Sequence, residues 1–245
     1  MTRTIHLLAI LGAMAAFVAA FLATGSTATT ARASAEAKPI RFAETVLFVE
    51  FNATDGDAGL HLELDGQRWA RVAINGPDGR RILDVTGRGA LEGYGLTALT
   101  FESSEPPFDE HPLPRFKKLF PEGVYRFSGT TVEGRELRGA ARLTHTFPAG
   151  PVVTAPSENA VVPRDAVVIR WKRVNRPAGV KIVSQQVIVS PDGPGATLEI
   201  ELPATATRLT VPAELVRPRS AYKVEVIARE KSGNQTITQV AFRTR

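Results

Sequence analysis

The chain has 245 residues, a formal net charge of +5 and no cysteine. The lack of cysteine excludes disulfides, thiol catalysis, Cys-based zinc sites and a lipid-modified N-terminal cysteine. Two of the 30 Lys and Arg residues lie in the first 33 positions, which leaves 28 basic against 25 acidic residues, a net charge of +3. Both signs are interspersed without a basic stripe, so nucleic-acid binding is not favoured.

The N-terminal segment has the features of a secretory signal. Arg3 supplies the positive charge, the 17 residues from Leu7 to Ala23 are apolar, and Ala31-Arg32-Ala33 is a cleavage pattern. We expect an apolar signal helix and a signal peptide over residues 1–33, followed by a linker over 34–43. Because the run is near the lower limit for crossing a bilayer of ~30 Å, a retained membrane anchor is the alternative. The expected location is therefore secreted or periplasmic.

Residues 44–148 are predicted to form a β-rich first domain. Apolar residues alternate with polar ones at Leu60, Leu62 and Leu64, which is typical of a half-buried strand. A hairpin is expected over 69–87, with its turn at 75–79, and further strands follow at 96–101, 125–127 and 137–147. One short helix is expected over 108–120, with acidic residues at its start and Lys117 and Lys118 at its end.

Residues 149–245 are predicted to form a second domain, because Pro148-Ala149-Gly150-Pro151 interrupts the strand pattern and Val152 restarts it. Seven short strands with Pro and Gly turns between them favour an antiparallel sandwich. The fold class we expect is therefore all-β, with two tandem antiparallel β-sandwich domains and one short helix in the first.

The second domain resembles fibronectin type III domains. Trp171 lies in an early strand, and the segment from Val216 to Tyr222 is similar to the family's L-x-P-x-x-x-Y motif, with Val216 in place of Leu and Pro218-Arg219 in place of Pro-Gly. The resemblance covers residues 152–245. It implies an immunoglobulin-like fold in which the Tyr222 hydroxyl contacts upstream backbone in a tyrosine corner.

The first domain is similar to segments of uncharacterised bacterial exported proteins that carry a fibronectin type III module. The similar passages are 51–59, 94–105 and 120–125. The resemblance implies a shared architecture and no particular activity.

Two groups of oxygen-bearing side chains are candidate sites. Asn52, Asp55 and Asp57 suggest calcium, but an EF-hand register starting at Asn52 places Asp57 where glycine is required, so a tight turn is favoured. Four carboxylates lie within nine residues, at Glu102, Glu105, Asp109 and Glu110. A glycosidase needs two of them fixed across a cleft, and a Pro-rich loop favours solvated carboxylates instead.

The remaining residues that could carry chemistry do not form a recognisable motif. His61 is expected on the polar face of its strand, His111 in a loop, and His145 in the core with a hydrogen bond. Ser103 and Ser104 lack the context of a nucleophile elbow. The segment Gly87–Gly93 lacks the Lys-Ser/Thr of a phosphate loop, and no helix is expected there. We therefore predict no catalytic residue, no metal ligand and no cofactor, and the ligand-binding residues stay unknown.

The sequence favours a non-enzymatic exported protein that recognises an unknown protein or polysaccharide of the cell envelope or extracellular space, without binding nucleic acid. The Pro-rich segment 104–123, with Phe108, Phe116 and Phe120, is the candidate for specificity, although these rings are more simply core residues. The alternatives are a carbohydrate-active or other hydrolase accessory protein and a calcium-stabilised surface module. Membrane contact is expected only if the signal helix is retained.

Overall fold

The computed structural model describes residues 38–245. The signal peptide predicted over residues 1–33 lies outside the described residues, and so do the first residues of the predicted linker. Within the described part, no helix is long and apolar enough to span a membrane.

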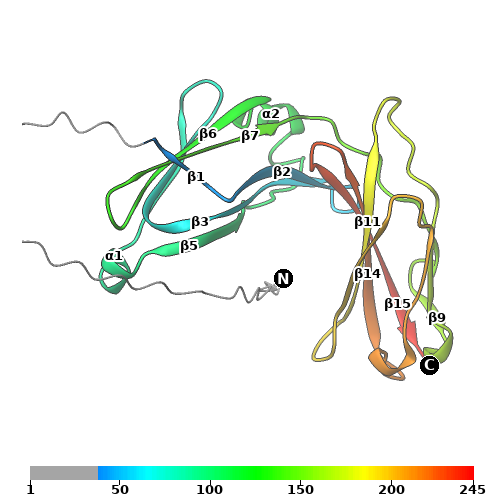
Figure 1. Ribbon diagram of the computed structural model, residues 1–245. Coiled ribbons are helices and arrows are strands. Elements are labelled where there is room, and N and C mark those ends of the chain that lie inside the picture. The colour runs from blue at the N-terminus through cyan, green and yellow to red at the C-terminus, as the bar shows by residue number, and fades with distance from the viewer. Residues whose placement is uncertain (1–37) are drawn as a thin grey trace, which may run out of the picture. The chain divides into compact units, whose positions relative to one another are not determined.

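The first half of the described chain consists of seven strands and two short helices (Figure 1). They are β1 (Ile40–Arg41), β2 (Glu44–Asn52), β3 (Asp57–Asn75), β4 (Arg81–Thr86), α1 (Ala90–Tyr94), β5 (Leu96–Glu102), α2 (Leu113–Leu119), β6 (Gly123–Thr131) and β7 (Glu136–Leu143). Two of the predicted linker residues therefore form β1, which pairs with β7, and the next residue, Phe42, is buried.

Strand β3 is central to this half because it belongs to two layers. Its first part pairs with β2 on one side and β5 on the other, and its second part pairs with β6 and β4. The pairing register shifts between Asp65 and Trp69, where the strand passes from one layer to the other. The strands expected at 60–64 and 69–74 are thus one strand of 19 residues. The hairpin expected over 69–87 is formed by β3 and β4.

The first core lies between the two layers of strands. Alternating residues of β2 and β3, among them Leu47, Val49, Leu60 and Leu62, are buried there, as the period-2 pattern predicts. Trp69 is fully buried in the same core.

The helices differ from the prediction in position and number. The helix expected over 108–120 is confined to α2, which starts at Leu113 after Pro112 and has no acidic residue in its first turn. Pro112 and Pro114 lack the backbone N–H that an earlier helical turn would need, so Asp109 and Glu110 lie in a preceding turn. A second helix, α1, occupies a segment where none was expected, and all its residues are exposed.

The second half consists of eight strands and two 3₁₀ turns (Figure 1). They are β8 (Val153–Ala155), β9 (Ala160–Val162), η1 (Arg164–Ala166), β10 (Val168–Trp171), β11 (Ile182–Pro191), β12 (Leu198–Pro203), β13 (Arg208–Thr210), η2 (Ala213–Leu215), β14 (Ala221–Glu230) and β15 (Gln235–Thr244). One strand more than expected is present, because the chain after β8 leaves β10 and β9 pairs with β15 instead.

This half is an antiparallel sandwich with a fibronectin type III-like strand order. Strands β12, β11, β14 and β15 form one sheet, and β13, β10 and β8 form the other. Their inner faces bury Ile169, Trp171, Val224 and Phe242. The tyrosine corner is present: the backbone N–H of Arg217 donates a hydrogen bond of 2.7 Å to the Tyr222 hydroxyl oxygen.

The two halves share hydrogen bonds as well as the chain connection. Strand β15 pairs in parallel with β2 over three residues, from Glu50↔Gln235 to Asn52↔Ile237. This pairing makes one continuous sheet in the order β1-β7-β6-β3-β2-β15-β14-β11-β12. The two hydrophobic cores nevertheless remain separate. The domain division at 148/149 stays a prediction.

Candidate functional site

The four carboxylates singled out in the sequence have different surroundings. Asp109 and Glu110 are exposed, as expected for a solvated loop, and Glu102 is exposed at the end of β5. Glu105 is not solvated: its side chain is 5% exposed and turns toward β3. The interpretation of this segment as uniformly solvated is therefore wrong at Glu105, because the chain after β5 folds back along the sheet.

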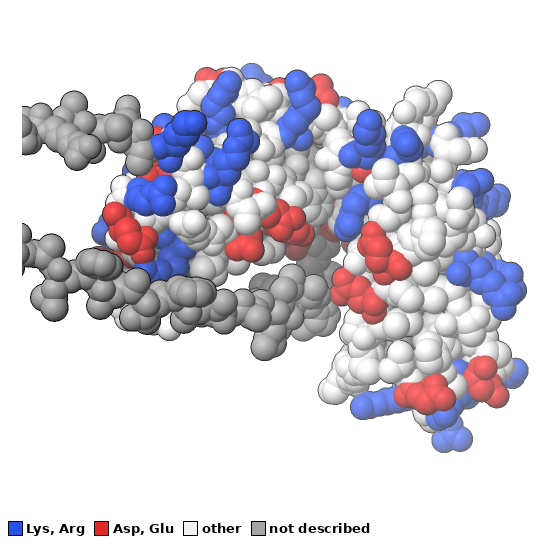
Figure 2. Space-filling model, viewed as in Figure 1, with Lys and Arg blue, Asp and Glu red and all other residues white. Residues whose placement is uncertain are grey.

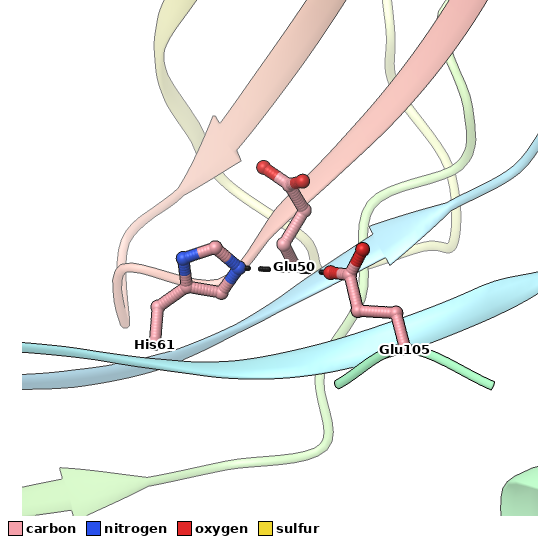
Figure 3. A group of neighbouring side chains, drawn as sticks. All are labelled: Glu50, His61 and Glu105. Atoms are coloured by element: carbon pink, nitrogen blue, oxygen red, sulfur yellow. Dashed lines mark ion pairs between the residues drawn. The ribbon is translucent and has the colours of Figure 1, made fainter. Parts of the chain in front are cut away.

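Glu105 meets two residues of the β2–β3 hairpin. The Nε2 atom of His61 lies 3.7 Å from the Oε1 atom of Glu105 (Figure 3). Glu50 completes a group in which one potential ligand atom from each of the three residues lies within 4.8 Å of the others. The hairpin register places Glu50 opposite Gly59 and Phe48 opposite His61, on the sheet face that points away from the first core.

Packing fixes each member of this cluster. The ring of Phe48 stacks on the imidazole of His61, with centroids 4.9 Å apart and planes 18° apart. The Nε2 atom of Gln235, at the start of β15, donates a hydrogen bond of 2.6 Å to the Oε2 atom of Glu50. Glu105 has room because residue 59 is glycine: a Cβ atom there would lie 2.8 Å from the Glu105 Cγ atom.

The electrostatics of the cluster follow from its partial burial. Desolvation raises the pKa of Glu50, against the opposing effects of His61 and of the hydrogen bond from Gln235. Desolvation alone would lower the pKa of His61, but the carboxylates of Glu105, Glu50 and Glu102 outweigh it and raise the pKa. The cluster thus favours a positive charge held among the carboxylates, either on the imidazole or as a bound cation.

A hollow of about 200 Å³ lies elsewhere in the first half, at the Pro-rich segment. Its lining is mostly apolar and consists of Ala58, Ser103, Ser104, Pro106, Phe108, His111, Phe116, Leu119 and Phe120. Phe116 is buried, whereas Phe108 and Phe120 are partly buried against the first core. The three rings therefore act both as core residues and as walls of the hollow.

His111 gives this hollow a polar group without a protein partner. Its Nδ1 atom is buried and has no hydrogen-bond partner among residues 38–245. Ser103 is already engaged, because its hydroxyl oxygen accepts a hydrogen bond of 2.9 Å from the N–H of Leu60. A ligand with an apolar body and one hydrogen-bonding atom would match such a lining.

The other residues considered in the sequence have local structural roles. The Oδ1 atom of Asn52 accepts hydrogen bonds from the N–H groups of Thr54 and Asp55, which closes the expected tight turn between β2 and β3. His145 lies beyond the end of β7 instead of within a strand, and its Nε2 atom is 2.8 Å from the Phe120 carbonyl oxygen. The hydrogen bond predicted for His145 is therefore present, in a half-buried position.

Arginine side chains from four strands gather on the outer face of the β4-β3-β6-β7 sheet. Figure 2 shows basic groups over this region. Strand pairing and the alternation of side chains place five exposed guanidinium groups and two carboxylates on this face. These residues are Arg71, Arg81, Arg126, Arg138 and Arg142, with Asp84 and Glu136. Asp84 pairs with Arg71 and Arg81, and Glu136 with Arg138. No basic stripe is visible in the sequence because these residues are up to 71 positions apart.

Glu50 is a residue of the cluster that the sequence does not single out. It lies within an alternating strand, where a polar residue signals a solvent-facing position. The signal available in the sequence was Gly59, two residues before His61, because Gly in a strand often marks a close approach by another group.

No family model and no curated protein sequence matches the chain. Among solved structures, it is similar to the FN1–FN3 domains of chicken CNTN1, with 10% identity and a TM-score of 0.35, over 84% of this chain and 65% of that one. It is also similar to a two-domain fibronectin type III segment of chicken tenascin, with 12% identity and a TM-score of 0.30, over 83% and 99% of the two chains. The second half is fibronectin type III-like in its strand order and in its tyrosine corner.

Proposed function

We propose that the protein is an exported, non-enzymatic recognition protein that binds a partner through the hollow at its Pro-rich segment. The signal-like composition of residues 1–33 supports export. Sandwich folds present loops at their ends for recognition, which supports a binding role. The observation that carries the proposal is the apolar hollow with the unpaired Nδ1 atom of His111.

The size and lining of the hollow favour a protein partner over a polysaccharide. A volume of about 200 Å³ is below that of drug-sized pockets and accommodates one bulky side chain. Aromatic and aliphatic walls suit an apolar side chain, whereas a sugar chain requires many hydrogen-bonding groups. The ligand we propose is a peptide segment with one Leu-sized or aromatic anchor and a polar atom that reaches His111.

The hydrolase alternative is less well supported by the geometry. Glu105 and Glu50 converge on His61, but the Glu105 side chain is 5% exposed, and none of the three residues lines the hollow at the Pro-rich segment. A glycosidase needs a cleft between its two carboxylates. The calcium-stabilised module has weaker support as well, because the side-chain amide of Asn52 donates a hydrogen bond to the Asp55 carboxylate within their turn.

Leu119 allows a test that leaves the core intact. Leu119 lines the hollow but is 46% exposed, and Leu91 on α1 is a matched control at 41% exposure. We expect peptides selected from a random library on residues 34–245 to bind L119E at least about tenfold more weakly, because a carboxylate at the mouth must be desolvated. Fluorescence anisotropy would measure both variants, and L91E should bind like the unmodified protein. Equal binding by L119E, or no selected peptides, would contradict the proposal.

A further inference from the structure

The cluster of Glu50, His61 and Glu105 has the composition of a metal site. It combines one imidazole nitrogen with two carboxylate oxygens, from β2, β3 and the segment after β5 (Figure 3). We propose that these three residues bind a divalent transition-metal ion, with zinc as the preferred ion. This inference is independent of the proposed recognition function, because the cluster and the hollow at the Pro-rich segment share no lining residue.

The distances within the cluster suit an ion better than direct contacts. The Nε2 atom of His61 is buried and has no hydrogen-bond partner among residues 38–245. Its separation of 3.7 Å from the Glu105 Oε1 atom is too long for a hydrogen bond. Zinc binds nitrogen and oxygen ligands at about 2.0–2.2 Å, so two ligands at a tetrahedral angle are roughly 3.4 Å apart. The potential ligand atoms of the three residues all lie within 4.8 Å of one another, so small side-chain shifts would bring them to such separations.

The donor set also selects among metals. Imidazole nitrogen favours zinc and its transition-metal neighbours, whereas calcium and magnesium prefer sites made entirely of oxygen. Two carboxylates neutralise a divalent cation, which lowers the cost of holding it in a partly buried position. Three protein ligands leave a fourth position for water.

Two neighbours would keep the ligands in place. The hydrogen bond from Gln235 to Glu50 orients one carboxylate, and the stacked ring of Phe48 fixes the plane of the imidazole. Such outer contacts tune metal affinity. Since Gln235 belongs to β15 and pairs with Glu50 of β2, a bound ion would also strengthen the contact between the two halves.

Gly59 provides a substitution that acts on the site without removing a ligand. A Cβ atom at this position would displace the Glu105 side chain, while the strand backbone is compatible with alanine, because residue 59 has no positive φ. We expect G59A to fold and to lose zinc affinity. H61Q and E105Q should lose it by removing a ligand, whereas H145Q and E110Q, on residues outside the cluster, should not.

The experiment is a titration of chelator-treated residues 34–245 with zinc chloride. Isothermal calorimetry should show one site, the Tm should rise with zinc and not with calcium, and the loss of affinity in H61Q, E105Q and G59A should be at least tenfold. X-ray absorption of the zinc complex should show the outer-shell scattering of one imidazole ring. The proposal is overturned if no zinc binds, or if zinc binds these three variants as tightly as the unmodified protein. Near-ultraviolet circular dichroism of each variant would establish that it is folded.

Discussion

At the level of single residues, Gln185 of β11 shows how a buried polar group limits stability. Its side chain is fully buried, and neither its amide nitrogen nor its oxygen has a hydrogen-bond partner within residues 38–245. An unpaired buried amide costs about 1–3 kcal/mol, which removal of the amide would recover. The sequence offers no warning of this, since Gln185 is followed by a second glutamine in an otherwise ordinary strand.

We expect Q185L to raise the free energy of unfolding by about 1 kcal/mol, because leucine fills a similar volume without an unpaired polar group. Urea denaturation would measure the change. The neighbouring Gln186 is the control: its Nε2 atom donates a hydrogen bond of 2.7 Å to Glu199, so Q186L should bring no gain. A lower midpoint for Q185L would show that the amide is satisfied, for example by water.

At the level of elements, β1 and the residue after it complete the first core. The ring of Phe42 is 8% exposed and lies above three glycines, where added Cβ atoms would come within 2.8 Å of it at Gly66, 3.3 Å at Gly129 and 3.1 Å at Gly139. The ring of Phe42 packs against the backbone of these glycines in space that larger residues would fill. Residues 34–43 read as a linker in the sequence because one aromatic residue in a short polar stretch gives no periodic signal.

Because the Phe42 ring packs over these glycines, a chain starting at Glu44 would lack part of the first core. F42A should lower the free energy of unfolding by about 3 kcal/mol through loss of buried apolar area and creation of a cavity. In a second test, the chain of residues 44–245, which lacks β1 and Phe42, should have a lower melting temperature than the chain of residues 38–245. Equal melting temperatures would mean that β1 and Phe42 do not contribute to the core.

At the level of the whole molecule, Asn234 connects the two halves. Its Oδ1 atom accepts a hydrogen bond of 2.8 Å from the N–H of Val49, and its Nδ2 atom donates to the carbonyl oxygens of Thr144 and Thr146 at 2.8 and 3.1 Å. In the sequence this residue belongs to a turn between two strands, and Asn234-Gln235-Thr236 matches the Asn-x-Ser/Thr glycosylation triplet. The structure buries it to 1% exposure, so the triplet is not accessible.

Loss of this side chain removes the hydrogen bonds by which the second half holds Val49, Thr144 and Thr146 of the first half. We expect N234A to destabilise the protein by about 2–3 kcal/mol and to separate the unfolding of the two halves into distinct calorimetric transitions. The exposed Asn175 serves as a control, since N175A should keep the original transition. A single, unchanged transition in N234A would mean that this contact does not couple the unfolding of the two cores.

The all-β class and most strands could be predicted from the sequence, because alternation with period 2 reports which face of a strand is buried. The order of Trp171, Pro218 and Tyr222 also indicated the sandwich of the second half. The helix limits were less predictable, because Pro112 and Pro114 act on single turns and leave no periodic pattern.

The candidate metal cluster and the arginine face were decided by tertiary structure alone. Glu50 and Glu105 are 55 positions apart, and they meet His61 only because the segment after β5 returns to the β2–β3 hairpin over Gly59. The sequence by itself determined a signal-like N-terminus, a cysteine-free chain and strands with one buried face. Which distant residues share a face, and which carboxylate is buried, depends on the pairing between strands, and single-residue patterns do not record that pairing.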